Sequence, residues 1–312
     1  MMSGNIRLRA AGLLAGAALL TTTACGAGAA ETAAPGGRPE VVAAFYPLQW
    51  VTEQVGGSDI KVTTLTAPGV EPHDLELNPQ QVAQIGAAAL AVYIKGVQPA
   101  VDEAVEQHAA GKSFDAATAV RTLPAAAHAE EGHEEEGHEH EVSYDPHIWL
   151  DPSRLATVAT RLGERLGEAD AAHAEAYRDR AAKTAATLTS LDQEMARGLA
   201  SCSVKTLVTG HEAFGYLADR YGLKQVGITI DPESEPSPAR IAEVAEVAKR
   251  EKVTTIFTET LVSPKAAEVL AKEVGAKTAV LDPLEGPPSG GDYVSAMRRN
   301  LQTLQTALGC SS

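Results

Sequence analysis

With 312 residues, the chain exceeds the size at which one hydrophobic core stops growing, roughly 250–300 residues, so we expect two lobes. Its formal net charge is −15, and an acidic chain without a basic cluster cannot bind phosphates by counterion release, which excludes nucleic acid as a partner. Beyond the amino-terminal segment, no apolar stretch approaches the ~20 residues that a membrane helix needs.

The first 24 residues have the pattern of a secretory signal peptide. Arg7 and Arg9 precede an apolar run at residues 10–20, and small residues then lead to Cys25. A cysteine in this place resembles the bacterial lipobox, in which the thiol is acylated, although Thr22 stands where that motif usually has leucine. The pattern predicts that Cys25 is the lipid-anchored first residue of the mature protein. An ordinary cleavage site with an incidental cysteine is the alternative.

Residues 25–39, rich in Pro, Gly and Ala towards their end, are predicted to form a tether between this anchor and the fold. Short β-rich runs then alternate with amphipathic segments, which indicates an α/β fold with parallel sheets covered by helices. A capping residue before proline marks four helix starts, at Asn78, Asp151, Ser237 and Ser263. The predicted strands are residues 41–46, 61–66, 90–94, 205–209, 224–230, 253–258 and 277–281.

Residues 171–199 are rich in strong helix formers and contain no proline. A single helix of ~29 residues would span roughly 43 Å, which suits a strut that joins two lobes. Two helices separated by a kink are the alternative. We therefore expect a first metal-binding lobe at residues 40–168, a linking helix at 169–199 and a second metal-binding lobe at 200–312.

Four potential metal ligands lie in loops of the predicted fold. His73, His211 and Asp282 follow predicted strands, and open α/β sheets bind ligands beyond the carboxyl ends of their strands. His147 lies in the loop before a predicted helix. Each residue alone is more often a hydrogen-bonded loop residue. Together, three imidazoles and one carboxylate form the four-coordinate set that Zn²⁺ prefers, whereas calcium or magnesium would need more oxygen.

Five motifs in this order resemble the signature blocks of the metal-binding cluster of solute-binding proteins of bacterial ABC transporters. They are EPHD at 71–74, DPHIWLDP at 145–152, GHEAFGY at 210–216, EPSP at 235–238 and LDPL at 281–284. The resemblance covers nearly the whole mature chain. It implies two α/β lobes joined by a backbone helix, with a metal held in the cleft between them. It places His73 and His147 on the first lobe and His211 and Asp282 on the second as the ligands.

In that family a histidine at the third ligand position accompanies zinc and a glutamate accompanies manganese, and this chain has His211. The resemblance thus implies a zinc-binding lipoprotein, and not an enzyme, that delivers Zn²⁺ to the permease of an ABC importer. We expect a monomer on the outer face of the cell membrane, attached only through Cys25. A zinc metallochaperone is a further candidate partner.

Two alternative functions remain compatible with the same residues. A manganese-binding homologue would share the fold. A zinc-dependent hydrolase could use the same four ligands, with Glu71, Glu212 or Glu259 as a base. However, a catalytic zinc keeps one coordination position open for water, and four protein ligands would close it.

Residues 125–141 form an acidic tract that holds seven glutamates and no apolar side chain larger than alanine. It resembles the histidine-rich acidic loop of zinc-binding members of the family, and its composition predicts an auxiliary, weak metal-binding loop. An acidic solvated insertion is the alternative. The histidines of this tract are His128, His133, His138 and His140.

Cys202 and Cys310 are the only cysteines after Cys25. An even pair in an exported, oxidising context predicts one disulfide. The final predicted helix, at about 293–308, should run back from the metal edge of the sheet and bring Cys310 beside Cys202.

Overall fold

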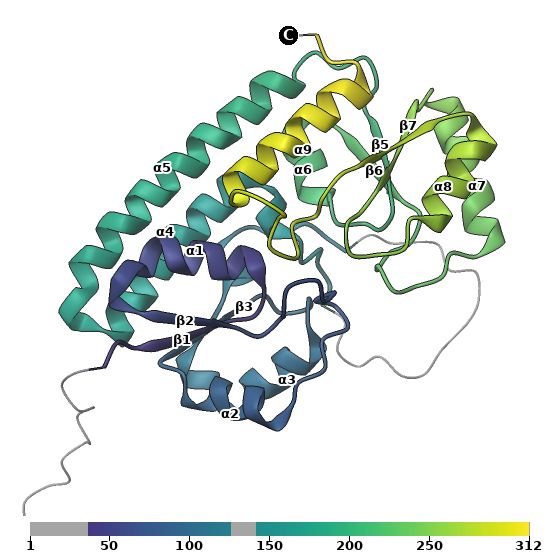
Figure 1. The fold of residues 1–312 in the computed structure, drawn as a ribbon. Helices are drawn as coiled ribbons and strands as arrows, with labels where there is room; N and C mark the ends of the chain where they lie inside the picture. Colours follow the sequence, from purple (N-terminus) through teal and green to yellow (C-terminus); the bar gives the residue numbers. More distant parts are fainter. Residues whose placement is uncertain (1–36, 126–141, 312) are drawn as a thin grey trace, which may run out of the picture. The chain divides into compact units, whose positions relative to one another are not determined.

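The computed structural model describes residues 37–125 and 142–311 of the chain (Figure 1). These residues form two lobes, each built on a four-stranded parallel sheet, in the strand orders β2-β1-β3-β4 and β6-β5-β7-β8. The α/β fold class predicted from the sequence is therefore confirmed. Cys25 and the four histidines of the acidic tract lie outside the described residues. None of the helices in residues 37–125 and 142–311 combines the length and the apolar character of a membrane span.

The first sheet carries α1 on one face and α2 and α3 on the other (Figure 1). Helix α2 begins where the sequence predicts, because Asn78 accepts hydrogen bonds from the backbone N–H groups of Gln80 and Gln81. The strands are β1 (Glu40–Ala43), β2 (Lys61–Thr64), β3 (Leu90–Tyr93) and β4 (Ser113–Asp115), and the helices are α1 (Tyr46–Gly56), α2 (Pro79–Ala87), α3 (Pro99–His108) and α4 (Pro152–Ala169). Short 3₁₀ helices lie at Gly57–Asp59, Ala110–Lys112, Ala116–Ala119, Ile148–Leu150 and Ala171–His173.

The second sheet lies between α7 and α8 on one side and α6 and α9 on the other (Figure 1). The Ser237 side chain caps α7 as predicted. Helix α8 instead begins after Pro264, with no side-chain hydrogen bond at its cap, so the capping role predicted for Ser263 is wrong. The strands are β5 (Thr206–Thr209), β6 (Lys224–Gly227), β7 (Thr255–Thr258) and β8 (Lys277–Val280), and the helices are α6 (Gly215–Tyr221), α7 (Pro238–Arg250), α8 (Lys265–Val274) and α9 (Tyr293–Leu308).

A long helix, α5 (Ala174–Leu199), joins the two lobes. Near its start, Arg180 pairs with Asp59 of the first lobe at 2.8 Å. Towards its end, Asp192 accepts two hydrogen bonds from Arg220 of the second lobe. Helix α5 also packs along α4, so the connection between the lobes consists of two helices side by side (Figure 1). The predicted linking helix is thus present as one helix that follows a 3₁₀ turn.

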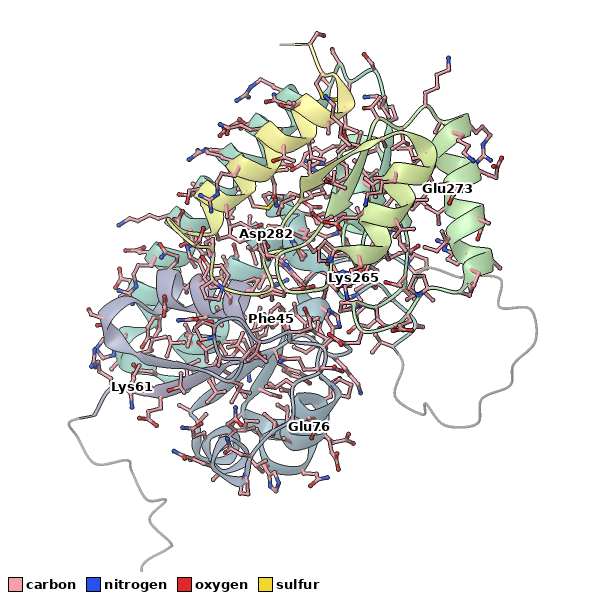
Figure 2. The ribbon with its side chains drawn as sticks, turned by 45° about the vertical axis from the view of Figure 1, so that its right-hand side comes forward. Phe45, Lys61, Glu76, Lys265, Glu273 and Asp282 are labelled. Atoms are coloured by element: carbon pink, nitrogen blue, oxygen red, sulfur yellow. A yellow bond between two sulfur atoms is a disulfide. The ribbon has the colours of Figure 1, made fainter. Side chains whose placement is uncertain are left out.

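Aromatic side chains pack where the two lobes meet. Phe45, labelled in Figure 2, lies edge-on to Trp149, with ring centroids 4.8 Å apart. Trp149 donates from Nε1 to the backbone carbonyl of Pro283 at 2.7 Å, and Tyr293 donates to the carbonyl of Trp149. Buried hydrogen bonds of this kind are costly to break because the freed groups cannot reach water. They fix the loop of the second lobe that follows β8 against the first lobe.

The predicted disulfide between Cys202 and Cys310 is present. It connects the segment before β5 to the end of α9, and the backbone N–H of Val204 donates to the carbonyl of Leu308 beside it. The bond lies at the amino end of β5, whereas the residues that follow the carboxyl ends of the strands face the first lobe. The disulfide and the candidate site therefore occupy opposite ends of the second sheet.

Candidate metal centre

His147 is oriented by the carboxylate of Asp145. The Oδ1 atom of Asp145 accepts a hydrogen bond from the backbone N–H of His147 at 2.9 Å and lies 2.8 Å from its Nδ1. A carboxylate in this place holds the ring proton on Nδ1, which leaves the lone pair of a neutral imidazole on Nε2. That Nε2 is buried and has no hydrogen-bond partner among the described residues. It is an acceptor that lacks a donor.

His211 is oriented in the same way by Glu259. His211 lies just beyond β5 and Glu259 is the first residue after β7, and the two strands are neighbours in the sheet. The Oε1 atom of Glu259 accepts from the backbone N–H of His211 at 2.8 Å, and Oε2 lies 2.6 Å from Nδ1. The Nε2 atom of His211 is again buried without a hydrogen-bond partner in the described part of the chain.

The third histidine and an unexpected glutamate complete the group. His73 lies in the irregular segment between β2 and α2, and its backbone N–H donates to Glu71 at 3.1 Å. Glu285 lies on the loop after β8, next to Leu284, which has a positive φ of 58°. A non-glycine residue in this conformation is strained, and it turns Glu285 towards the histidines of the first lobe.

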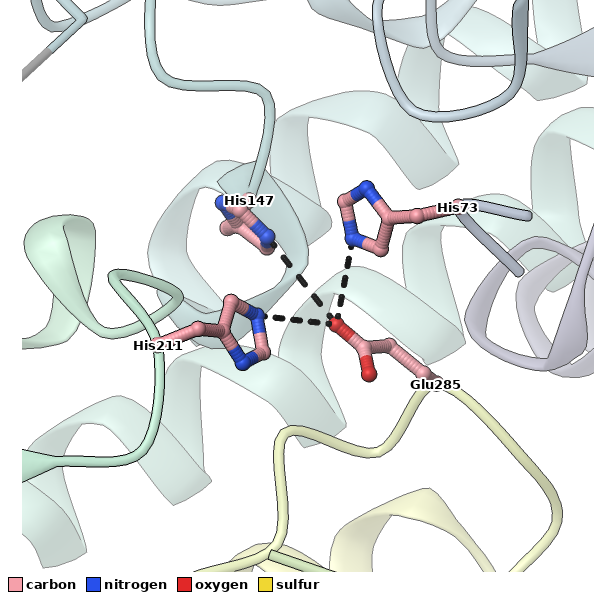
Figure 3. A group of neighbouring side chains, drawn as sticks. All are labelled: His73, His147, His211 and Glu285. Atoms are coloured by element: carbon pink, nitrogen blue, oxygen red, sulfur yellow. Dashed lines mark ion pairs between the residues drawn. The ribbon is translucent and has the colours of Figure 1, made fainter. Parts of the chain in front are cut away.

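The four side chains converge on one point (Figure 3). The Oε1 atom of Glu285 lies 3.5 Å from Nε2 of His73, 3.5 Å from Nε2 of His211 and 3.9 Å from Nε2 of His147. All four potential ligand atoms lie within 4.8 Å of one another. The side chain of His73 is 15% exposed, whereas those of His147, His211 and Glu285 are 6%, 1% and 1% exposed. The group is nearly closed to solvent, with His73 at its edge.

Asp282 does not belong to this group, which corrects the fourth member expected from the sequence. Its Oδ1 accepts hydrogen bonds from the backbone N–H of Leu284 at 2.8 Å and from Thr260 at 3.3 Å. Its backbone N–H and carbonyl pair with the side chain of Asn300. Asp282 thus fixes the turn that follows β8, and the turn places Glu285 in the position expected for Asp282.

The charges of the group are strongly coupled. Burial lowers the pKa of His147, and the contact with Asp145 only partly offsets it. Burial also lowers the pKa of His211, but the carboxylates of Glu259 and Glu285 outweigh it and raise this pKa well above its ordinary value. Burial raises the pKa of Glu285, yet its contacts with His211 and His73 hold it well below its usual range. In the metal-free protein these shifts favour an ionised Glu285 beside a protonated His211.

A second glutamate lies at the margin of the group. Burial, followed by the negative charge of Glu285, raises the pKa of Glu71 to about 7. Its Oε2 atom is buried without a hydrogen-bond partner among the described residues. A divalent cation in the group would relieve the repulsion between Glu71 and Glu285.

Three nitrogen donors and one carboxylate around one buried point, between two α/β lobes, define a two-lobed protein with a candidate transition-metal site. The model of a protein family described as "Zinc-uptake complex component A periplasmic" matches residues 41–307. The chain belongs to this family.

Relatives and solved structures agree with this assignment. The zinc-binding lipoprotein AdcA of Streptococcus pneumoniae is 35% identical over 279 residues, which cover 86% of this chain and 56% of the relative. The high-affinity zinc uptake system protein ZnuA of Bacillus subtilis is 34% identical over 305 residues, 94% of this chain and 95% of the relative. The Zn(II)-bound ZnuA-like domain of S. pneumoniae AdcA matches with a TM-score of 0.72 at 34% identity, over 87% of this chain and 99% of that domain. The chain thus spans about half the length of AdcA.

Proposed function

We propose that this chain is the extracytoplasmic zinc-binding component of an ABC importer and that it delivers Zn²⁺ to a membrane permease. The observation that carries the proposal is that the buried Nε2 atoms of His73, His147 and His211, all without a hydrogen-bond partner among the described residues, face the Oε1 atom of Glu285. Buried polar atoms normally have partners. A metal ion would satisfy all four at once. Membership of the zinc-uptake family supports the same conclusion.

Zinc fits this donor set better than the other common divalent ions. In a tetrahedral zinc site with bonds of about 2.0–2.1 Å, neighbouring ligand atoms lie roughly 3.3 Å apart. The three distances from Glu285 Oε1 to the imidazoles, 3.5, 3.5 and 3.9 Å, are close to this spacing. Manganese, magnesium and calcium favour more oxygen ligands, so the manganese alternative is disfavoured. We assign His73, His147, His211 and Glu285 as the ligands.

This arrangement suits a carrier better than a hydrolase. Four protein ligands fill a tetrahedral zinc, and a catalytic zinc needs an open position for water. Glu259, a candidate base for such a reaction, is occupied by both of its hydrogen bonds to His211. We therefore assign the bound ion as cargo and assign no enzymatic activity to the chain.

Metal analysis of the purified protein, followed by competition with a chromophoric zinc chelator, tests the proposal. We expect one tightly bound zinc per chain and at least ~100-fold weaker binding after His211→Ala. Loss of a metal ligand should weaken binding more than the ~10–100-fold effect of losing a residue that only hydrogen-bonds to a ligand. His108→Ala, on the exposed end of α3, is the matched control and should change the affinity less than twofold. Tighter binding of Mn²⁺ than of Zn²⁺, or an unchanged affinity after His211→Ala, would refute the assignment.

The remaining assignments are part of the same proposal. Residues 40–168 and 200–312 are the two metal-binding lobes and residues 169–199 the linking helix, in accord with the two sheets and α5. The chain acts as a monomer, held at the outer face of the cell membrane by a lipid on Cys25. Its partners are the permease and, as a further candidate, a zinc metallochaperone. The relative named a zinc-binding lipoprotein supports the anchor.

The histidines of residues 125–141 form an auxiliary, weak site in this proposal. Calorimetry should give one tight site and one or more weak sites, and deletion of residues 125–141 should remove only the weak class. Loss of the tight site in a folded deletion variant would contradict this division of roles. The four residues concerned are His128, His133, His138 and His140.

A further inference from the structure

Two glycines that flank His211 lie directly against the carboxylates that orient the histidines. A Cβ atom built on Gly210 would lie 2.6 Å from Oε1 of Glu259, and one built on Gly215 would lie 2.3 Å from Oδ2 of Asp145. Contacts this short do not occur in folded proteins, so one of the two groups would have to move. Neither glycine has a positive φ. The space beside the carboxylates, rather than the backbone conformation, therefore requires glycine at both positions.

The carboxylates cannot move away without releasing the histidines. Each accepts hydrogen bonds from both the backbone N–H and the Nδ1 of its histidine. The backbone of Asp145 is also held, because its carbonyl accepts from the hydroxyl of Tyr216 at 2.6 Å and its N–H donates to the carbonyl of Leu123 at 3.0 Å. A methyl group at Gly210 would push on Oε1 of Glu259, the oxygen that accepts from the backbone N–H of His211, and one at Gly215 would push on Oδ2 of Asp145. Either push displaces the whole carboxylate and so disturbs the contact of its other oxygen with Nδ1.

The two contacts differ in what they join. Gly210 and Glu259 both belong to the second lobe, where they follow the neighbouring strands β5 and β7. Gly215 opens α6 in the second lobe, whereas Asp145 belongs to the segment of the first lobe that carries His147. The segment from Gly210 to Gly215 therefore contacts two orienting carboxylates. Gly210 contacts Glu259 of the second lobe, and Gly215 contacts Asp145 of the first lobe.

We propose that Gly210 and Gly215 are positioning residues that hold the two carboxylate–histidine pairs at the spacing that the bound metal requires. This inference rests on the proposed zinc site. Sites of this kind need their ligands within about 0.5 Å of the productive geometry. A shift of a carboxylate by the width of a methyl group exceeds that tolerance. The glycines thus determine metal affinity without contacting the ion.

Three alanine variants test the proposal in the full-length protein. Gly210→Ala and Gly215→Ala should each weaken zinc binding by about 10–100-fold, the effect of losing a group behind a metal ligand. Gly111→Ala is the matched control, because Gly111 is exposed and a Cβ there meets nothing within 4 Å. It should change the affinity less than twofold. The absorption spectrum of the Co²⁺-loaded protein should change in the two site variants and stay as in the wild type in the control.

A second substitution separates positioning from a general loss of fold. Glu259→Asp removes one methylene, which makes room for the methyl of Gly210→Ala. Alone it should weaken binding because the shorter carboxylate no longer reaches Nδ1. In the Glu259→Asp background, Gly210→Ala should cause no further loss of zinc affinity or of thermal stability of the metal-free protein, because the shorter carboxylate no longer meets the methyl group. A double variant that binds zinc more weakly than Glu259→Asp alone would overturn the inference.

The outcomes also separate this inference from the proposed function. If the wild type and Gly111→Ala bind no zinc, the proposed zinc site itself fails. If the wild type binds zinc and both site variants bind it within twofold, with an unchanged Co²⁺ spectrum, the glycines do not position the site and the inference fails alone.

Discussion

The Oε1 atom of Glu285 lies 3.5 Å from the Nε2 atom of His211, and both side chains are almost fully buried. A carboxylate in such a place costs several kcal/mol in lost hydration unless a cation or hydrogen-bond donors compensate it. In the metal-free protein the compensating charge is the proton on His211. In the loaded protein it is the metal ion, so proton and metal compete for the same small volume.

Glu285 rather than Asp282 should therefore control metal affinity. Glu285→Gln keeps the shape of the side chain but removes its charge, and we expect zinc binding to weaken by more than ~100-fold. Asp282→Asn keeps an oxygen that can accept from the N–H of Leu284, so we expect a loss of no more than about tenfold. Chelator competition measures both. A larger loss for Asp282→Asn would restore Asp282 as the ligand.

Glu259 should be the most sensitive residue that does not contact the metal. In Glu259→Gln one of the two oxygens next to His211 becomes an NH₂ donor. If that donor faces Nδ1, it favours the tautomer with the proton on Nε2, which cannot bind a metal. We expect about 10–100-fold weaker zinc binding. Glu251→Gln, on the exposed end of α7 in the same lobe, is the control. A Glu259→Gln variant within twofold of the wild type would mean that the contact does not orient His211.

Local sequence patterns predicted most of the fold. The runs of β-branched residues and the capping residues before proline act over a few residues, and seven of the eight strands among the described residues follow from them. Strand β4 was missed because it has only three residues, of which Phe114 alone is buried. The strand predicted at 41–46 also runs too far, because Tyr46 and Pro47 open α1.

The sequence predicts three of the four members of the group: two histidines that follow strands and one that lies in the loop before a helix. It also predicts Asp282, which follows a strand but lies outside the group. His73, His147 and His211 meet in space, as their positions in the α/β pattern imply. Glu285 was missed because its direction depends on the positive φ of Leu284 and on the contact between Asp282 and Asn300 of α9. Both are tertiary features that no local pattern contains. The pairing of Glu259 with His211 also depends on tertiary structure, because it requires β5 and β7 to be neighbours in the sheet. The sequence does not show which strands are neighbours, so it does not predict this pairing.

The disulfide should stabilise the second lobe without affecting the metal. The two cysteines are 108 residues apart, and closing a loop of about this length contributes about 2–5 kcal/mol to the free energy of unfolding. The double variant Cys202→Ala with Cys310→Ala should be less stable by that amount in denaturant unfolding. Its zinc affinity should stay within twofold of the wild type because the bond lies at the opposite end of the sheet. A large loss of affinity in a folded double variant would show that the two ends are coupled.

The pH dependence of zinc binding should follow from His211. Burial lowers the pKa of this imidazole, but Glu259 and Glu285 outweigh burial and raise it well above its ordinary value, so the metal-free protein holds a proton there at neutral pH. Zinc binds only the neutral ring, so binding releases that proton. Because the raised pKa belongs to the metal-free state, affinity should rise with pH up to that pKa and fall on acidification.

Calorimetry in buffers of different ionisation enthalpy would measure this release, and we expect about one to two protons per zinc between pH 6.5 and 7.5. One comes from His211 and a further fraction comes from Glu71, whose pKa of about 7 in the metal-free protein falls when a cation binds beside it. Glu259→Gln removes one of the charges that raise the pKa of His211. This variant should therefore release fewer protons per zinc bound than the wild type. His173→Ala is the control, because His173 is half exposed and pairs with Asp170 far from the group; it should release the same amount. Zinc binding with no proton release and no change in affinity over this range would show that His211 is already neutral in the metal-free protein.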